Sequence, residues 1–260
     1  MARIIAYVAN RSDRLLEALL EERGAIGEWP AEQADAWGIG FYQGGEVLHK
    51  KRPYRGGDPI SWKDIAGNVR SDCAIIHLRR ASVGDYRAEN THPFRMRRWL
   101  FAHHGTVYGF EAMRAALIES LPDFLRRNIR GTTDSEVVFH IFLSFLHDRG
   151  LIDALDVDSQ AVVSALRSTV LLIDRMSTEV GAPLADLDVA LSNGRLTAVA
   201  CRGAPMFYVE RQFPEDGHGP PFRYVLAYGG SEAPPDYTPI QKGQGILITR
   251  EIQVRPFCLA

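Results

Sequence analysis

Cysteine is scarce in this 260-residue sequence, and the scarcity excludes two kinds of scaffold. The three cysteines, Cys73, Cys201 and Cys258, are far apart and odd in number, and no CxxC pair occurs. A disulfide framework and a zinc site built from thiolates both need paired or regularly spaced cysteines. We therefore expect neither of them, and we expect the protein to work in a reducing compartment, the cytoplasm.

Long apolar runs and an excess of charge of one sign are also missing. The longest apolar runs, such as residues 170–173, fall far short of the roughly 18 residues that a membrane span requires. The N-terminal MARIIAYVAN is too short in apolar residues for the roughly 7–15 of a secretory signal. Thirty basic and thirty-two acidic residues leave a formal net charge of -2, so neither nucleic acid nor an anionic membrane is expected as a partner.

The composition that remains is that of an ordinary globular protein, 46% hydrophobic and 24% charged. Short β-branched and aromatic runs predict strands near both ends of the chain, with helices between them. The first group of strands is predicted at residues 4–8, 37–42, 47–50, 73–78 and 100–103. More strands follow Gly181, and the order predicts one domain, residues 1–260, with two sheets and a helical layer.

Three local signals define boundaries of these elements. Ser12 is predicted to be the N-cap of a first helix that Gly24 ends. Thr133 and Glu136 have the spacing of a capping box, in which each side chain bonds the other residue's backbone amide at the start of a buried helix. Asn193-Gly194 predicts a hairpin with a type I′ turn.

The densest chemistry lies between His77 and Gly105 and at one helix start. An arginine, Arg79, directly follows a predicted strand, and Asp134 stands where the buried helix begins. A guanidinium binds a carboxylate through two hydrogen bonds, and a carboxylate binds an ammonium group. An arginine and an aspartate presented together therefore suit the main-chain end of an amino acid.

Five ordered motifs carry a resemblance to a known family. They are DAWGIGFY (35–42), HLRRASVG (77–84), NTHPF (90–94), FAHHG (101–105) and TDSE (133–136), with GSE (230–232) after them. Together they resemble the class II glutamine amidotransferases, which are N-terminal-nucleophile hydrolases. The subgroup that they resemble most is the stand-alone, single-domain one that includes γ-glutamyl amide hydrolases. The resemblance spans nearly the whole chain.

The resemblance implies a fold and a mechanism. The family fold is an α+β, four-layer αββα sandwich of two mainly antiparallel sheets with helical outer layers. In the family, a cysteine directly after the initiator methionine becomes N-terminal, and its thiolate attacks the side-chain amide of glutamine. The α-amine of the same cysteine serves as the base, so the nucleophile carries its own base.

The resemblance also implies roles for individual residues. Arg79 would hold the α-carboxylate of the substrate, and Asp134 would hold the α-ammonium. Ser82 lies where the family has Thr or Ser in the pocket wall, and His92 is placed with it among the substrate-binding residues. The backbone N–H of Gly105 would stabilise the oxyanion.

Two departures from the family pattern concern the positions that cleave the amide in the family. Position 2 is Ala2 where the family has its nucleophilic cysteine, and a methyl group cannot attack an amide. The asparagine that stabilises the oxyanion in the family corresponds to His104. An imidazole N–H can donate a hydrogen bond there, or His104 can be a packed histidine that fills the space of the asparagine. A smaller departure is Ala36 within the first motif.

The residues also allow plainer interpretations. Arg79 and Asp134 would be a structural ion pair, and Ser82 would be a turn residue. His77 and His92 would be scaffold residues held by hydrogen bonds. The four histidines at 77, 92, 103 and 104 would bind a metal only if they converged, and adjacent residues of a strand point to opposite faces. We therefore expect no metal and no cofactor.

Three hypotheses of function follow. The leading one is a protein that binds glutamine or a γ-glutamyl compound without cleaving it, as a sensor or as a partner subunit, with a homodimer as one form of partnership. The second is an active glutamine or γ-glutamyl amidohydrolase in which the native cysteine at position 2 has been replaced by Ala2. The third, a metal-dependent enzyme that uses the histidine cluster, is the weakest of the three.

Overall fold

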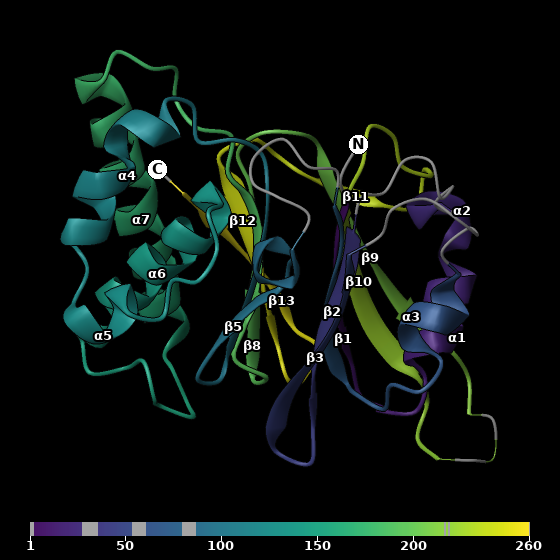
Figure 1. Cartoon of the computed structure of the whole chain (residues 1–260). Coiled ribbons are helices and arrows are strands. Elements are labelled where there is room, and N and C mark those ends of the chain that lie inside the picture. Colours follow the sequence, from purple (N-terminus) through teal and green to yellow (C-terminus); the bar gives the residue numbers. More distant parts are fainter. Residues whose placement is uncertain are drawn as a thin grey trace.

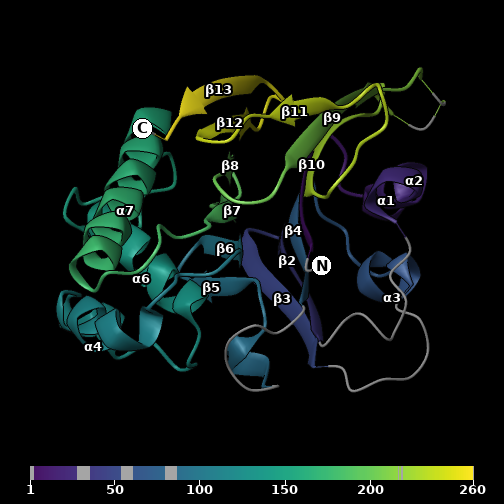
Figure 2. The same cartoon turned by 90° about the horizontal axis from the view of Figure 1, so that it is seen from above.

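Two antiparallel β-sheets lie face to face at the centre of the molecule, and helices cover the outer face of each (Figures 1 and 2). This computed structural model describes residues 3–27, 36–53, 61–79, 87–215, 217 and 219–259. The predicted α+β fold with four layers, helix–sheet–sheet–helix, is confirmed.

The first sheet has seven strands in the order β11-β9-β10-β1-β4-β2-β3. The N-terminal strand β1 lies inside the sheet, where it pairs with β10 on one side and with β4 on the other. A strand that is apolar on both faces suits this central place. The strand bounds are β1 Arg3–Ala9, β2 Ala36–Gln43, β3 Glu46–Pro53, β4 Cys73–Arg79, β9 Met206–Gln212, β10 Arg223–Gly229 and β11 Thr238–Ile240.

The second sheet has six strands in the order β13-β12-β8-β7-β6-β5. Its middle is a meander in which β6, β7 and β8 pair with their neighbours in the chain. The strand bounds are β5 Phe94–Met96, β6 Trp99–His104, β7 Asp188–Ser192, β8 Leu196–Cys201, β12 Gln244–Thr249 and β13 Val254–Cys258.

The helices form two unequal outer layers, a small one on the first sheet and a large one on the second (Figure 1). The small layer consists of α1 Leu15–Glu21, α2 Arg23–Ile26 and α3 Trp62–Ala66. The large layer consists of α4 Phe110–Glu119, α5 Asp123–Arg126, α6 Asp134–His147 and α7 Ser159–Glu179. A 3-10 helix, Ala88–Asn90, precedes β5.

Three hydrophobic clusters fill the three interfaces between the four layers. Strand β1 shows how the sequence assigns side chains to them, because successive residues of a strand point to opposite faces. Ile4, Ala6 and Val8 belong to the cluster between the two sheets. Ile5 and Tyr7 belong to the cluster under α1 and α3. The third cluster lies between the second sheet and the helices α4–α7.

The predicted first helix is in fact two short helices, and its predicted ends are wrong. Ser12 and Asp13 form a turn. Helix α1 begins at Leu15, and its N-cap residue, Arg14, forms no capping hydrogen bond with its side chain. Gly24 lies inside α2, and the chain leaves the helix at Gly27, whose φ is +72°. A cap must stand directly before the first helical residue, and this turn separates Ser12 from Leu15.

The predicted capping box of α6 is half confirmed. The Thr133 hydroxyl accepts a hydrogen bond from the backbone N–H of Glu136, at 3.3 Å. The Glu136 carboxylate accepts instead from the backbone N–H groups of Arg130, at 3.0 Å, and Gly131, at 2.6 Å. Glu136 thus ties the preceding turn to the helix rather than closing the reciprocal box.

The predicted hairpin at Asn193-Gly194 is confirmed, but its turn type is wrong. A type I′ turn needs a positive φ at both central residues. Gly194 has φ +86°, whereas Asn193 is not among the residues with positive φ. The Asn193 side-chain oxygen accepts from the backbone N–H groups of Arg195 and Leu196, at 3.0 and 2.9 Å, and so closes a longer loop.

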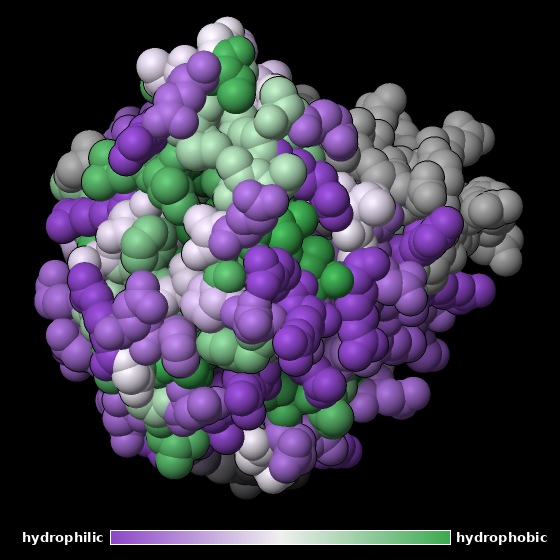
Figure 3. All heavy atoms as spheres, turned by 60° about the vertical axis from the view of Figure 1, so that its left-hand side comes forward, coloured by the Kyte–Doolittle hydropathy of each residue, from purple (hydrophilic) through white to green (hydrophobic). Residues whose placement is uncertain are grey.

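The outer surface of the large helical layer is a mosaic of polar and hydrophobic residues. Figure 3 shows hydrophilic side chains over most of this face, with smaller hydrophobic groups between them. The exposed hydrophobic residues of α7 and the chain after it include Leu171, Val180 and Leu184. None of the helices in the described part of the chain is both long and apolar enough to cross a membrane.

Candidate functional site

Several predicted site residues lie where strands end and a helix begins. Strand β4 ends at Arg79, and β6 ends at His104, directly before Gly105. Helix α6 begins at Asp134 and packs on β6 from the outer side of the second sheet. The two sheets place the ends of β4 and β6 at the same edge of the sandwich, and we call this edge the site end.

Arg79 is a buried arginine at the site end. Cys73 and Ile75 belong to the cluster between the sheets, and side chains alternate along a strand, so Arg79 shares their face. Its relative exposure is only 4%. A guanidinium buried to this degree is costly unless anionic or polar groups surround it, which makes this position a suitable carboxylate-binding point.

The rings of His77 and His92 pack against each other at an angle of 42°, next to Arg79. Their ring centroids are 4.2 Å apart, and both side chains are buried. By distance and angle, none of their four ring nitrogens has a hydrogen-bond partner in the described ranges, although the backbone of His103 lies close enough to His77 to oppose the lowering of its pKa. The plainer interpretation, a scaffold role through hydrogen bonds, therefore receives no support from the described contacts.

Burial keeps these two imidazoles neutral. Desolvation lowers the pKa of His77 well below its ordinary value, and the nearby His104, His103 and Arg79 lower it further. Desolvation likewise lowers the pKa of His92 well below its ordinary value, with His77 as the next cause. Neutral imidazoles can both donate and accept hydrogen bonds, so the pair is polar but uncharged.

Two glycines of β2 make room for the loop that carries His92. A Cβ on Gly38 would lie 2.1 Å from the backbone oxygen of His92, and a Cβ on Gly40 would lie 3.0 Å from the Pro93 ring and 2.7 Å from Leu100 of β6. Any larger residue at position 38 would push the loop away from the sheet. The glycines of the DAWGIGFY motif thus have a packing role, which is to let the NTHPF motif approach β2.

His103 and His104 point to opposite faces, as the strand pattern predicts. His103 is buried on the helix side, where its ring contacts Ser135 and the backbone of Asp186. His104 is partly buried, and no described residue forms a hydrogen bond with its imidazole. Burial lowers the pKa of His104, and the carboxylate of Asp188 opposes this effect.

Gly105 follows His104 in a conformation that glycine alone adopts easily. Its φ is +135°, and a Cβ there would lie 2.0 Å from the backbone oxygen of Asp186. Both the backbone angle and the contact therefore require glycine. The role of the Gly105 backbone N–H as an oxyanion donor, which the resemblance implies, remains a prediction.

Asp134 is a buried carboxylate that joins α6 to the segment after Gly105. One oxygen accepts from the backbone N–H of Val107 at 2.9 Å, and the other accepts from the backbone N–H of Ser135 at 2.7 Å. Its relative exposure is 4%. Helix N-termini favour negative charge, so the carboxylate is well held at this place.

A hydrogen-bonded chain behind Asp134 was not predicted from the sequence. His103 Nε2 lies 2.9 Å from the backbone oxygen of Asp186, which only accepts, so this nitrogen carries the proton. With the proton on Nε2, His103 Nδ1 accepts the single hydroxyl proton of Ser135 at 2.8 Å, and the Ser135 oxygen also lies in contact with the Asp134 carboxylate, at 3.2 Å. The doublet of histidines and the serine after Asp134 were the available signals, but contact between them depends on how the layers pack.

Several predicted residues lie outside the described residues. They are the nucleophile position Ala2, the pocket position Ser82 and the first residue of the DAWGIGFY motif, Asp35. Their roles remain predictions. Within the described residues, no three His, Cys, Asp or Glu side chains form a group that could hold a metal ion.

The described thiols at the centre of the fold are not activated nucleophiles. Burial raises the pKa of Cys73 and of Cys201 to about 11. Because the thiolate is the nucleophile, neither residue is activated at neutral pH. What the site end offers is a buried guanidinium, a buried carboxylate and neutral imidazoles, which is a set suited to binding a polar, zwitterionic molecule.

The comparison with protein families agrees with this chemistry. A family model described as class-II glutamine amidotransferases matches residues 16–218. YafJ of Escherichia coli strain K12, a candidate glutamine amidotransferase, is 31% identical over 120 residues, which are 44% of this chain and 44% of YafJ. The γ-glutamyl-hercynylcysteine sulfoxide hydrolase of Mycobacterium tuberculosis strain H37Rv is 35% identical over 75 residues, 28% of this chain and 32% of that protein.

The matches span less than half the length of these curated relatives. Among solved structures, a glutamine aminotransferase class-II domain protein from Silicibacter pomeroyi superimposes with a TM-score of 0.64 and covers 99% of both chains. Its sequence identity is 22%, so this likeness concerns the fold.

Proposed function

This chain belongs to the class II glutamine amidotransferase family, and from that premise we propose that it binds glutamine or a γ-glutamyl compound without hydrolysing it. Arg79 holds the α-carboxylate and Asp134 holds the α-ammonium of the ligand. Ser82 and His92 line the pocket. The protein then acts as a sensor or as the glutamine-binding subunit of a larger assembly.

The observation that carries this proposal is the position of Asp134. Its carboxylate is buried at the start of α6 and bonded to Val107, two residues after Gly105. The recognition residue and the oxyanion segment are thus held together by a direct hydrogen bond. A charge-assisted hydrogen bond between a carboxylate and an ammonium group is among the stronger polar contacts that a binding site makes.

Lack of hydrolysis follows from the two substitutions in the sequence. Ala2 has no atom that could attack an amide carbon, and the buried thiols Cys73 and Cys201 have raised pKa values. His104 at the oxyanion position has an imidazole in place of the carboxamide of asparagine.

A second candidate function is an active glutamine or γ-glutamyl amidohydrolase that has a cysteine at position 2 in its native form. The observation that favours it is Gly105, whose backbone still has the conformation that only glycine adopts easily. The name of the Mycobacterium tuberculosis relative, a γ-glutamyl hydrolase, also supports it. Ala2 would then be an introduced substitution.

Calorimetry with L-glutamine, L-glutamate and a γ-glutamyl dipeptide tests the binding. Arg79→Ala should weaken the binding of glutamine by about 1.5–3 kcal/mol, the range for a hydrogen bond to a charged group. Asp134→Asn should weaken it similarly, and Asp123→Asn on the exposed face of α5 is the matched control. Absence of binding heat for all three ligands would contradict the proposal.

Ammonia release from glutamine separates the two candidate functions. Ala2→Cys restores a nucleophile, and Ala2→Cys with His104→Asn also restores the oxyanion side chain. If His104 is a poor donor, the double variant should be faster than the single one by roughly 10²–10³, the effect of one oxyanion donor. Full activity of the single variant would favour the amidohydrolase, and mass spectrometry must confirm that Met1 has been removed.

Three wider proposals accompany this function. We propose that residues 1–260 act as one domain, which the 99% coverage by the Silicibacter pomeroyi structure supports. The scarcity of cysteine supports a cytoplasmic location. A ligand-binding subunit without its own chemistry needs a protein partner or a second copy of itself, and size-exclusion chromatography with and without glutamine would test this.

A further inference from the structure

A hollow of about 440 Å³ lies at the end of the sandwich opposite to the site end. Strand β4 begins directly after Asp72 and β6 directly after Arg98, and both residues line the hollow. The same strands end at Arg79 and His104. At about 3.3 Å per residue, six or seven residues of strand separate the two places by roughly 20 Å. We call this second place the arginine hollow.

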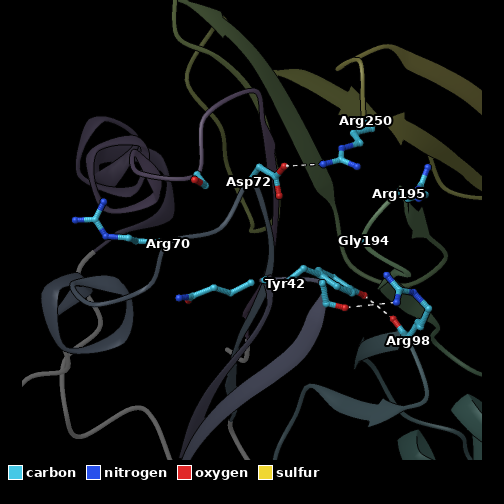
Figure 4. Close-up of a pocket in the computed structure, with 11 residues that line it drawn as sticks. Tyr42, Arg70, Asp72, Arg98, Gly194, Arg195 and Arg250 are labelled. Carbon is cyan, nitrogen blue, oxygen red and sulfur yellow. Dashed lines mark hydrogen bonds and ion pairs between the residues drawn. The ribbon is translucent and has the colours of Figure 1, made fainter. Parts of the chain in front are cut away.

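Three arginines from three turns line the arginine hollow. Arg98 comes from the turn between β5 and β6, Arg195 from the turn between β7 and β8, and Arg250 from the turn after β12. Figure 4 shows them on one side of the hollow, with Asp72 opposite Arg250. A fourth lining arginine, Arg70, points away from the other labelled side chains in the same view.

The positive charge of these arginines is poorly compensated. Asp72 is the carboxylate among the lining residues, and its oxygen is 3.9 Å from Arg250. Arg195 pairs with Asp156 at 2.9 Å, but Asp156 is 80% exposed and does not line the hollow. An exposed ion pair of this kind contributes little energy and leaves the guanidinium available.

The Arg98 guanidinium is incompletely hydrogen-bonded. Its Nη1 group donates to the backbone oxygen of Gly45 at 3.4 Å, a long bond. Its Nε atom is buried and has no hydrogen-bond partner within the described ranges. A buried guanidinium N–H without a partner is costly, so the Arg98 side chain gains hydrogen bonds if it turns to bind an anion in the hollow.

We propose that the arginine hollow binds a phosphorylated small molecule. One guanidinium group can bind two phosphate oxygens at once. Three guanidinium groups that come from different turns suit a tetrahedral, multiply charged phosphate better than a planar carboxylate. The Tyr42 hydroxyl lies within hydrogen-bonding distance of the backbone oxygens of Arg98 and Ser192, so it helps to fix the turn that carries Arg98. The volume lies within the range of small-molecule pockets and admits a ligand up to the size of a nucleotide.

Calorimetry with pyrophosphate, ATP and inorganic phosphate at low salt tests this proposal. Pyrophosphate or ATP should bind, and Arg195→Ala and Arg250→Ala should each weaken that binding about tenfold or more. Arg175→Ala is the matched control, because it removes one exposed arginine that pairs with Glu179 on α7, away from the hollow. Equal binding of pyrophosphate and ATP would identify the phosphates as the whole ligand, whereas tighter binding of ATP would show that the rest of the molecule contributes.

One further variant is expected to bind pyrophosphate more tightly, a result that a variant which merely fails to fold cannot give. Asp72→Asn removes the carboxylate that faces the arginines, so it should tighten the binding of pyrophosphate several-fold. Circular dichroism of each variant checks its fold. No binding of pyrophosphate or ATP by the unaltered chain would overturn the proposal, as would an equal loss in Arg175→Ala. Binding of a single-stranded oligonucleotide through the same arginines, with no binding of pyrophosphate, would also overturn it.

Discussion

The two ends of the sandwich use the same strands but handle charge in opposite ways. At the site end, Arg79 and Asp134 are buried, and the adjacent imidazoles of His77 and His92 are kept neutral. At the arginine hollow, Arg195 and Arg250 lie in exposed turns with partial compensation. Replacing Arg79 or Asp134 should therefore lower the stability of the fold. Replacing Arg195 or Arg250 should mainly weaken ligand binding.

The largest expected effect is the loss of stability caused by adding one methyl group at Gly105, at the site end. Gly105→Ala should lower the free energy of unfolding by about 3–5 kcal/mol, because it adds a strained φ and an overlap with the Asp186 carbonyl. Gly150→Ala is the control, since Gly150 has φ +68° but no atom within 4 Å of the added Cβ. It should cost only about 1–2 kcal/mol. Urea unfolding of both variants measures the difference, and equal losses would contradict the packing argument.

Alternation along strands was predictable from the sequence, and contacts between layers were not. The run from Ile4 to Val8 indicates a buried strand, and the HHG motif places two histidines on opposite faces. The link between His103 and Ser135 joins positions 32 residues apart, so it depends on how α6 docks on β6. No local rule could supply that docking.

The same limit applies to the arginine hollow. It is assembled from turns at residues 98, 195 and 250, and each arginine alone has the appearance of an ordinary exposed side chain. By contrast, the pattern predicted the hairpin at Asn193-Gly194 and failed only at its turn type, because the Asn193 side chain bonds two backbone N–H groups. Local competition of this kind between side chain and backbone is decided by the packed structure.

The second prediction concerns pH and the neutral histidines of the site end. Below about pH 6.5 the unfolded chain binds protons at His77 and His92, whereas the folded chain does not, because burial lowers their pKa values. The unfolded state then binds more protons, so stability falls as the pH falls, by at most about 1.4 kcal/mol per pH unit for each histidine. His104 and His140, whose pKa values burial also lowers, act in the same direction.

Urea unfolding between pH 7.5 and 5 measures this slope. His92→Phe removes one of the buried imidazoles and keeps a ring that can pack against His77. The dependence of stability on pH should then become shallower by up to about 1.4 kcal/mol per pH unit, the effect of one proton. His147→Phe is the control, because His147 is exposed at the end of α6. An unchanged slope in His92→Phe would show that His92 is not held neutral.

The third prediction tests whether the chain behind Asp134 positions the carboxylate. Ser135→Ala removes the hydroxyl that lies between His103 and Asp134, and it should cost about 1–2 kcal/mol of stability. It should also weaken glutamine binding, because Asp134 then loses a contact that fixes its rotamer. Ser144→Ala on the same helix, whose hydroxyl bonds only the Ile141 carbonyl, is the control. A stability loss with unchanged glutamine affinity would assign Ser135 a structural role alone.

The smallest expected effect lies at the arginine hollow and sharpens the contrast between the two ends. Asp156→Ala breaks the ion pair with Arg195, in which the two side chains are 43% and 80% exposed. Because water already screens this pair, the free energy of unfolding should change by less than about 1 kcal/mol. Arg195 is then free to turn fully towards the hollow, so pyrophosphate should bind more tightly and with a steeper dependence on salt. Thermal unfolding and calorimetry on the same protein separate the two effects. A large loss of stability would mean that the open end also depends on buried charge, and the contrast between the two ends would fail.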